Sequence, residues 1–282
     1  MQQKIYQIDR TDSAKLIARY TIGFLKLSTI NQEEDAKYAG SGVLVSVGNM
    51  LGVLTAAHVL DVLPKDGPVG LVDFSGLFQK IIMPMKATKR FSMGNFPWSE
   101  NGPDIAFLLL PIEFADILKG KLSFLNLILA RDNFNADSNK TAQFFDVALG
   151  GLGRLEEGTR DVKASVPNYK SKIVEGRALF GNTAPKAPHV GMDLLQFTPE
   201  QSVDFTSPKS FEGISGGGLW RIYLDLDEAK NVKCNSPQLI GIAFYQLDEG
   251  TIKHSIVCHG PKSIYESFYQ KLDSELNSNG TF

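Results

Sequence analysis

The sequence has few cysteines, no long apolar run and almost no net charge. Cys234 and Cys258 are its only cysteines, too few for a disulfide framework; they could form one bridge, although we favour two reduced thiols. No stretch of about 18 apolar residues occurs, so we expect no membrane-spanning segment and no membrane partner. The net charge of −2 creates no field that would draw the chain to nucleic acid, so no nucleic-acid partner is expected.

Metal, cofactor and secretion signals are also missing from the sequence. No group of cysteines and histidines has the spacing of zinc ligands, so we predict no metal and no cofactor. Residues 1–10 lack the basic start and apolar core of a secretory signal. With so few cysteines, this favours a cytoplasmic location.

Short apolar segments bounded by turn residues recur along the chain. We expect strands at residues 19–27, 43–47, 51–55, 69–74, 80–85, 105–110, 144–149, 171–180, 194–197, 218–223, 239–245 and 254–258. One convincing helix begins at Pro261, and its apolar face carries Ile264, Phe268, Leu272 and Leu276. Residues 112–140 are interpreted as an irregular crossing and 183–191 as a proline-rich loop. The pattern predicts an all-β protein with two barrels or sandwiches.

Three polar residues stand at the ends of apolar strands. His58 follows two small alanines, Asp104 introduces a buried strand, and Ser215 lies in a glycine-rich stretch. Such a stretch forms either an ordinary hairpin turn or a turn that presents a nucleophilic hydroxyl beside backbone N–H groups. The other histidines, His189, His254 and His259, have no comparable surroundings and are expected to be surface or structural residues.

Three blocks around these residues resemble the signature blocks of the chymotrypsin/trypsin-like serine proteases, in the same order. They are residues 55–58 (TAAH), 104–106 (DIA) and 213–217 (GISGG). Segments 147–153 and 241–243 and the C-terminal helix extend the similarity over most of residues 20–276. The resemblance implies two six-stranded antiparallel β-barrels with a C-terminal α-helix. Residues 1–125 would carry His58 and Asp104, and residues 126–282 would carry Ser215.

The resemblance also implies a chemistry. Ser215 would attack an acyl carbon, His58 would accept and return its proton, and Asp104 would hold the imidazole in place. The N–H groups of Gly213 and Ser215 would form the oxyanion hole. The expected function is a serine endopeptidase that acts on protein or peptide substrates.

Five residues near the serine are candidates for substrate binding. Lys209 matches the base of the family's specificity pocket, where it would favour an acidic side chain, unless it is simply solvated. Glu212 matches the pocket rim and would oppose that preference. Phe244, Tyr245 and Gln246 match the edge that pairs with the substrate backbone. Gln246 often corresponds to glycine in the family, so it would narrow the pocket or else merely end a strand.

Two departures from the family bear on regulation. Ile214 replaces the aspartate that pairs with a new N-terminus after zymogen cleavage, so we predict no such activation and any control through a protein partner, a ligand or a loop rearrangement. Val59 and Phe211 replace flanking cysteines, which points to intracellular bacterial-type members, some of which act in signalling or defence. Two other interpretations stay open: a catalytically weak peptide-binding module, and an effector that is latent until a partner orders its second barrel.

Overall fold

The structure is a computed structural model in which strands dominate. It describes residues 10–30, 33–74, 80–94, 97–137, 143–151, 156–157, 172–173, 176–189, 191–200, 211, 213–226, 232–234, 237–249 and 253–278. Lys209 and Glu212 lie outside these residues. None of the helices in the described part is long and apolar enough to cross a membrane.

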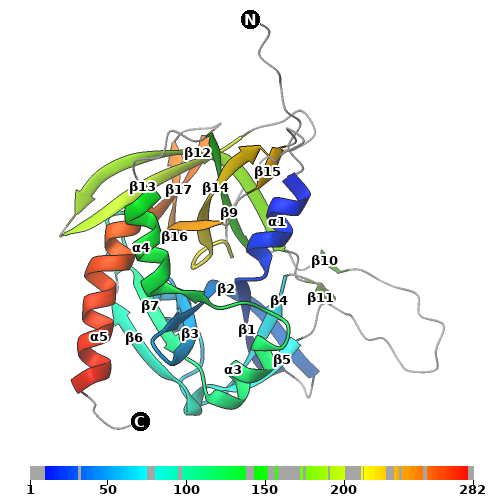
Figure 1. The fold of residues 1–282 in the computed structure, drawn as a ribbon. Coiled ribbons are helices and arrows are strands. Elements are labelled where there is room, and N and C mark those ends of the chain that lie inside the picture. The colour runs from blue at the N-terminus through cyan, green and yellow to red at the C-terminus, as the bar shows by residue number, and fades with distance from the viewer. Residues whose placement is uncertain are drawn as a thin grey trace, which may run out of the picture.

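The first half of the chain forms a mainly antiparallel sheet of eight strands, called the first sheet (Figure 1). Its strands are β1 Thr21–Ile30, β2 Glu33–Val47, β3 Met50–Thr55, β4 Pro68–Asp73, β5 Lys80–Pro84, β6 Lys89–Met93, β7 Ile105–Leu109 and β8 Leu125–Asn126. The strand order is β5-β4-β1-β2-β3-β7-β6, and β8 pairs in parallel with β2. The two ends of this order, β5 and β6, follow each other in the chain and are joined by a single turn, η1 Met85–Ala87. The strand order therefore returns to its starting point, as in a barrel.

The second half forms a sheet of seven strands, called the second sheet. Its strands are β9 Phe144–Gly151, β12 Gly176–His189, β13 Met192–Pro199, β14 Gly218–Leu226, β15 Val232–Cys234, β16 Gln238–Glu249 and β17 Lys253–His259. The pairing β14–β9 closes the ring β14-β16-β17-β13-β12-β9, so these six antiparallel strands form a barrel. Two short strands, β10 Glu156–Glu157 and β11 Lys172–Ile173, pair separately. The predicted all-β fold of two antiparallel barrels with a C-terminal helix is confirmed.

The expectation of an irregular crossing at residues 112–140 is wrong. This segment contains α3 Ile112–Lys119 and α4 Leu127–Asp137. Each helix buries only a narrow apolar stripe, Ala115 and Leu118 in α3 and Leu127 and Ala130 in α4, while Ile112, Ile117 and Leu129 are exposed, so the apolar pattern of a helix is weak here. The side chain of Asn126 caps α4 by accepting the N–H groups of residues 128 and 129 at 3.0 and 3.1 Å.

The proline-rich loop expected at residues 183–191 is also largely wrong. β12 continues to His189 and pairs with β13, with Pro185 opposite Leu195. Pairing with β9 ends at Gly181, so the prolines lie where β12 has only one neighbour in the sheet, an edge position at which proline is tolerated. β12 is therefore a long strand in spite of its prolines.

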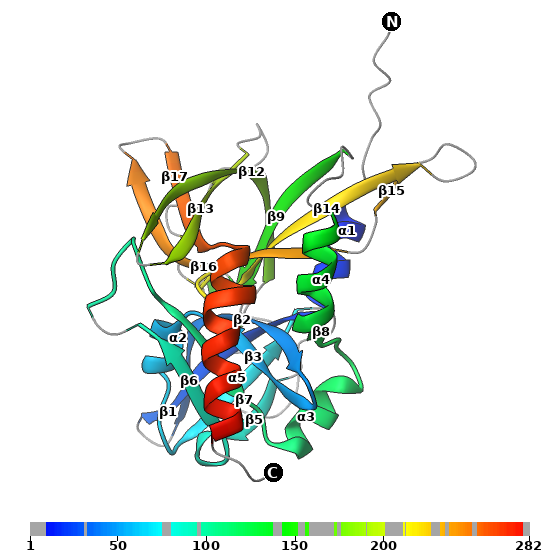
Figure 2. The same ribbon diagram turned by 60° about the vertical axis from the view of Figure 1, so that its left-hand side comes forward.

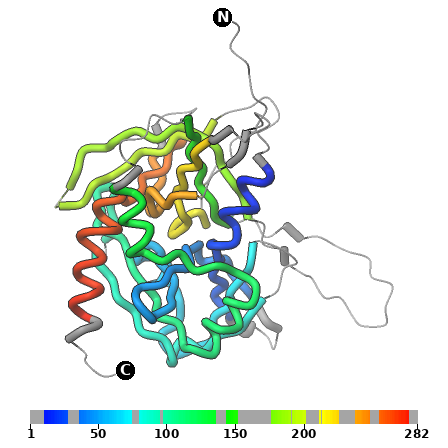
Figure 3. Tube along the Cα trace, viewed as in Figure 1, coloured from blue at the N-terminus to red at the C-terminus, as the bar shows by residue number. Residues whose placement is uncertain are grey.

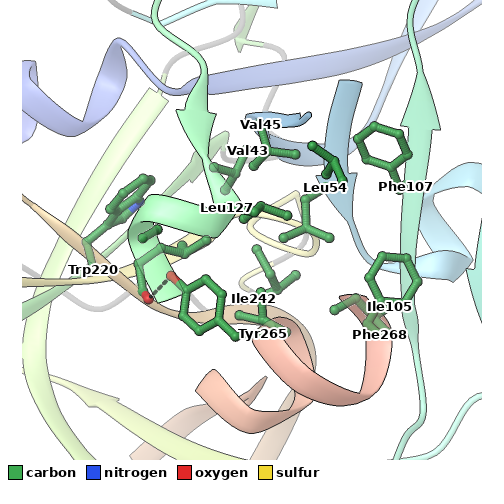
Figure 4. Packing of buried hydrophobic residues seen from close by; sticks show 14 of the residues in the cluster. Val43, Val45, Leu54, Ile105, Phe107, Leu127, Trp220, Ile242, Tyr265 and Phe268 are labelled. Atoms are coloured by element: carbon green, nitrogen blue, oxygen red, sulfur yellow. Dashed lines mark hydrogen bonds between the residues drawn. The ribbon is translucent and has the colours of Figure 1, made fainter. Parts of the chain in front are cut away.

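One hydrophobic cluster joins both sheets and the C-terminal helix (Figure 4). Its members come from β2, β3 and β7 of the first sheet, from β14 and β16 of the second, and from α4 and the last helices: Val43, Val45, Leu54, Phe107, Trp220, Ile242, Leu127, Tyr265 and Phe268. The Tyr265 hydroxyl donates a hydrogen bond to the Leu239 carbonyl at 2.8 Å. Shared burial of this size holds the two sheets in a fixed arrangement.

The C-terminal helix begins as predicted at Pro261 and continues through the π-helical segment η2 Ser263–Phe268 into α5 Tyr269–Ser278. Ile264, Phe268 and Leu272 are buried as expected, and the side chain of Leu276 is outside the described part. The carboxylate of Asp193 accepts the N–H of Ser263 at 2.6 Å, which caps the first turn. α5 then runs down beside the first sheet (Figure 2).

The first helix, α1 Arg10–Ala18, lies beside the second sheet although it precedes the first one (Figure 3). Its residue Ile17 is fully buried in the shared cluster. Cys258 on β17 is a buried free thiol. The side chain of Cys234 is outside the described part, so two reduced thiols stay a prediction.

Candidate active site

His58 lies on the short helix α2 Ala57–Asp61, directly after strand β3. Ala56 and Ala57 are buried, and their small side chains let the helix begin against the sheet. The His58 side chain keeps 25% of its surface exposed. An imidazole anchored by buried backbone but open on one side can exchange a proton with a bound molecule.

Asp104 is buried at the start of β7, and both of its carboxylate oxygens face His58. Oδ1 accepts the backbone N–H of His58 at 3.0 Å, and Oδ2 lies 2.6 Å from Nδ1 of the same residue. A buried carboxylate requires such partners. The contact fixes the tautomer, because a proton on Nδ1 leaves the lone pair of Nε2 for a proton from elsewhere.

Ser215 stands in a tight turn at residues 211–217. The Ile214 N–H donates to the Phe211 carbonyl at 3.0 Å, and the Gly217 N–H donates to the Ile214 carbonyl at 2.7 Å. Gly213 and Gly216 have φ of 95° and 81°, values that L-residues with a side chain rarely adopt. The glycines therefore shape the turn that carries a half-buried Ser215.

The N–H groups of Gly213 and Ser215 have no acceptor within the described part of the chain. Both residues are half-buried, so part of this turn is open to solvent. Uncommitted backbone donors beside a hydroxyl are the arrangement that an oxyanion hole needs.

Hydrogen bonds from Ser41 and its neighbour Tyr38, two residues of the first sheet that we call the bracket, hold this turn. The N–H of Ser41 on β2 donates to the carbonyl of Ser215 at 2.8 Å, and its hydroxyl donates to the carbonyl of Gly213 at 2.6 Å. The Ser41 oxygen also accepts the Gly151 N–H at 2.9 Å and lies 2.7 Å from the Tyr38 hydroxyl. Sequence reasoning missed Ser41 and Tyr38; the only signal was the pair of glycines that flanks Ser41.

Close backbone approaches bring the Ser215 turn next to α2. A Cβ on Gly40 would lie 2.6 Å from a methyl of Val59 and 3.0 Å from the carbonyl oxygen of Ser215. Gly40 thus lies between the neighbour of His58 and the serine. The structure contains no hydrogen bond between the Ser215 hydroxyl and His58.

A pocket with a volume of about 90 Å³ adjoins Ser215. It is lined by Phe211, Ile214, Ser215, Ala243, Phe244, Tyr245, Gln246 and Ile256. The side-chain oxygen of Gln246 accepts the Phe211 N–H at 2.7 Å, which ties the strand to the turn. The structure therefore brings three of the five predicted substrate-binding residues together at Ser215.

His259, one of the histidines expected to be surface or structural residues, also belongs to this region. His259 at the end of β17 is fully buried, and its Nε2 accepts the backbone N–H of Asp104 at 3.0 Å. Burial lowers the pKa of His259 to about 4, although the nearby charges of Asp104 and Asp193 act in the opposite direction. His189 is exposed and His254 lies beside Phe211 in an edge-on ring contact.

The described residues contain no group of three or more histidine, cysteine, aspartate or glutamate side chains placed to hold a metal ion. The groups that could act chemically here are the imidazole of His58, the carboxylate of Asp104, the hydroxyl of Ser215 and two backbone donors.

Comparison with known proteins places the fold among the trypsin-like serine proteases. The HtrA-type protease AlgW, in a structure with a decapeptide, matches with a TM-score of 0.50 and 14% identity, covering 94% of this chain and 68% of that one. A variant of AlgW with a decapeptide matches with a TM-score of 0.45 and 14% identity, covering 95% of this chain and 67% of that one. No model of a known family and no curated protein matches the sequence. At this identity the likeness shows the fold alone.

Proposed function

We propose that the chain is a serine endopeptidase that uses Ser215, His58 and Asp104. The observation that supports this most is the 2.6 Å contact between Asp104 Oδ2 and His58 Nδ1, beside a glycine turn that carries Ser215. A histidine with a purely structural role would not need a glycine turn with a serine so close to its helix, where Gly40 lies between Val59 and the Ser215 carbonyl. The fold shared with an HtrA-type protease also supports this chemistry.

The proposed reaction proceeds through an acyl-enzyme. The Ser215 hydroxyl oxygen attacks the carbonyl carbon of the scissile peptide, and its proton passes to His58 Nε2. Asp104 stabilises the resulting imidazolium through Nδ1. His58 then gives this proton to the leaving amine as the C–N bond breaks. A water molecule next attacks the ester and gives a proton to His58, which passes it to the Ser215 oxygen as the ester bond breaks.

Gly213 and Ser215 supply the oxyanion hole in this proposal. Their N–H groups would bind the charge that develops on the carbonyl oxygen in the tetrahedral intermediate. Losing one such donor costs about 100- to 1,000-fold in turnover in enzymes of this kind. The hydrogen bonds from Ser41 to the carbonyls of Gly213 and Ser215 support this role, because they orient the peptide groups on either side of Ile214 and Ser215.

The substrate would be a peptide bound along β16. β16 pairs with β14 only as far as Ile242, while its pairing with β17 continues to Glu249. The segment that begins at Phe244 therefore has an edge onto which an extended peptide could add as a strand. Phe244, Tyr245 and Gln246 would then contact the residue that precedes the cleaved bond. A decapeptide accompanies the structurally similar AlgW.

We further propose that the turn is formed without zymogen cleavage. Ile214 is buried, with 1% of its surface exposed, and offers no charge for a new N-terminus. Ser41 supplies hydrogen bonds to the turn from within the chain instead. Control by a partner or ligand and a cytoplasmic location stay predictions from the sequence. A boundary at residues 125/126 remains our proposal, although α1 packs against the second sheet.

A fluorophosphonate probe tests the proposal, because it reacts only with an activated serine. Wild-type protein should be labelled, and Ser215→Ala should not. His58→Ala should label much more slowly, while Ser274→Ala, which changes an exposed serine on α5, should label like wild type. Labelling of Ser215→Ala as fast as wild type would overturn the assignment of the nucleophile.

A second candidate, peptide binding with little turnover, is favoured by one observation. The Gln246 side chain is held against the turn by its bond to the Phe211 N–H, and the pocket is small. This alternative expects peptides from a diverse library to bind equally well to wild type and Ser215→Ala, with no cleavage by either. Cleavage by wild type alone would exclude it.

A further inference from the structure

His259 is buried at the contact between the two sheets, 155 residues from the aspartate that it touches. Its Nε2 accepts the backbone N–H of Asp104 at 3.0 Å. The carboxylate of the same aspartate faces the backbone N–H and Nδ1 of His58. One residue of the first sheet thus connects a histidine of α2 with a histidine of β17.

The direction of the hydrogen bond defines the state of His259. An amide N–H can only donate, so Nε2 must present its lone pair and the ring proton must lie on Nδ1. The ring is therefore neutral while the contact exists. Nδ1 is buried and has no hydrogen-bond partner among the described residues, so within them the Asp104 N–H is the hydrogen-bond contact of this imidazole.

The surroundings fit the imidazole closely. The Phe244 ring stacks on it with centroids 4.2 Å apart and planes 17° from parallel. On another side, a Cβ on Gly102 would come within 2.7 Å of His259 Cε1, and Gly102 has φ of 64°. The chain that leads into Asp104 can pass the ring here only because Gly102 lacks a side chain. Phe244 also lines the pocket at Ser215, so His259 lies between the pocket wall and Asp104.

We propose that His259 is a positioning residue: by accepting the Asp104 N–H, it holds from the second sheet the carboxylate that orients His58. The inference rests on the proposed protease function, but its geometry concerns Asp104 and His58 alone. The Asp104 side chain can adopt only one orientation, because a small rotation would break its contact with either the backbone N–H or Nδ1 of His58. A fixed backbone at residue 104 keeps both contacts together.

Two variants separate positioning from mere packing. His259→Phe keeps a ring against Phe244 but removes the acceptor, leaving the Asp104 N–H buried and unpaired. His259→Gln retains an acceptor near the place of Nε2. We expect His259→Phe to lower kcat by about 10- to 100-fold with KM within about twofold, and His259→Gln to recover most of the loss. Equal kcat in His259→Phe and wild type, or a loss in His259→Gln as large as in His259→Phe, would overturn the proposal.

Proton NMR gives a readout that does not need catalysis. The proton between His58 Nδ1 and Asp104 should give a low-field signal in wild type and in His259→Gln. In His259→Phe it should shift or broaden, while the thermal unfolding midpoint shows that the variant is folded. An unchanged signal in folded His259→Phe would refute positioning even if the chain cleaved no peptide. If peptides are not cleaved but the signal responds as expected, the proposed function fails and the positioning role stands.

Discussion

The hydroxyl of Ser41 donates a 2.6 Å hydrogen bond to the carbonyl oxygen of Gly213, across the contact between the two sheets. Ser41 has one hydroxyl proton, so the Tyr38 hydroxyl must donate to its oxygen in turn. Burial raises the pKa of Tyr38 well above its usual value, which keeps that donor protonated. The turn that carries Ser215 is therefore oriented by residues of the first sheet.

Removing the Ser41 hydroxyl should damage catalysis more than stability. Ser41→Ala leaves the Gly213 carbonyl without its donor and frees the neighbouring peptide to rotate. We expect kcat to fall by about 10- to 100-fold with little change in KM, since the loss concerns transition-state binding. Steady-state kinetics on a cleaved peptide measure both constants.

Two further variants complete this test. Tyr38→Phe should lower kcat less than Ser41→Ala, because the Ser41 hydroxyl keeps its bond to Gly213. Ser46→Ala, on the same strand, should be neutral, since no hydrogen bond from the Ser46 side chain occurs in the described part of the chain. If Ser41→Ala retained full kcat, the bracket would have no part in forming the oxyanion hole.

The sequence was informative where neighbouring residues carry the signal. His58 and Asp104 were predicted as candidates from adjacent small and apolar residues, and in the structure His58 Nδ1 and Asp104 Oδ2 are 2.6 Å apart. The small surroundings of a catalytic group are local in sequence, which makes such groups recognisable. The two barrels were predictable for a similar reason, because strand periodicity is also local.

The sequence was uninformative where the environment is assembled from distant segments. His259 becomes a partner of Asp104 only because β17 and β7 meet in the folded chain, and nothing next to it in sequence signals this. Ser41 contacts a turn 172 residues away for the same reason. α3 and α4 were missed because each buries only a narrow stripe. Lys209 and Glu212 stay untested predictions.

Gly216 tests whether the turn tolerates a side chain. A Cβ there would lie 2.0 Å from Thr55 Oγ1 and 2.1 Å from the Ser41 carbonyl oxygen, and φ is 81°. Gly216→Ala should therefore lose about 3 kcal/mol or more of unfolding free energy, or fold with the turn displaced and inactive. Gly48→Ala is the matched control: its φ is 58° but its Cβ would meet nothing within 4 Å. It should cost only about 1–2 kcal/mol. Urea denaturation measures the unfolding free energy of both variants. Equal losses in the two would show that the close contacts around Gly216 are unimportant.

The pocket beside Ser215 should select small apolar side chains. Its volume of about 90 Å³ is below the roughly 150 Å³ of a cavity that admits benzene. Peptides with alanine or valine before the scissile bond should be cleaved faster than those with phenylalanine or lysine. Gln246→Ala removes the tie to Phe211 and enlarges the pocket, so its preference should move towards larger residues. Cleavage of a peptide library by both proteins measures the preferred residue before the scissile bond. Identical profiles would show that Gln246 does not determine this preference.

The buried His259 should make the protein less stable in acid. Its pKa is about 4 in the folded chain and about 6.5 when unfolded, so between these values the unfolded state binds more protons. This contribution is fully present above pH 6.5 and is lost as the pH falls towards 4, by about 3 kcal/mol of unfolding free energy. The charged groups that face the ring, Asp104 and Asp193, oppose this lowering of the pKa.

Urea denaturation between pH 4.5 and 7.5 tests this. The plot of unfolding free energy against pH should have a shallower slope for His259→Gln than for wild type. His189→Gln, at an exposed histidine, should keep the wild-type slope, and the same slope in all three proteins would show that His259 is not held neutral by burial.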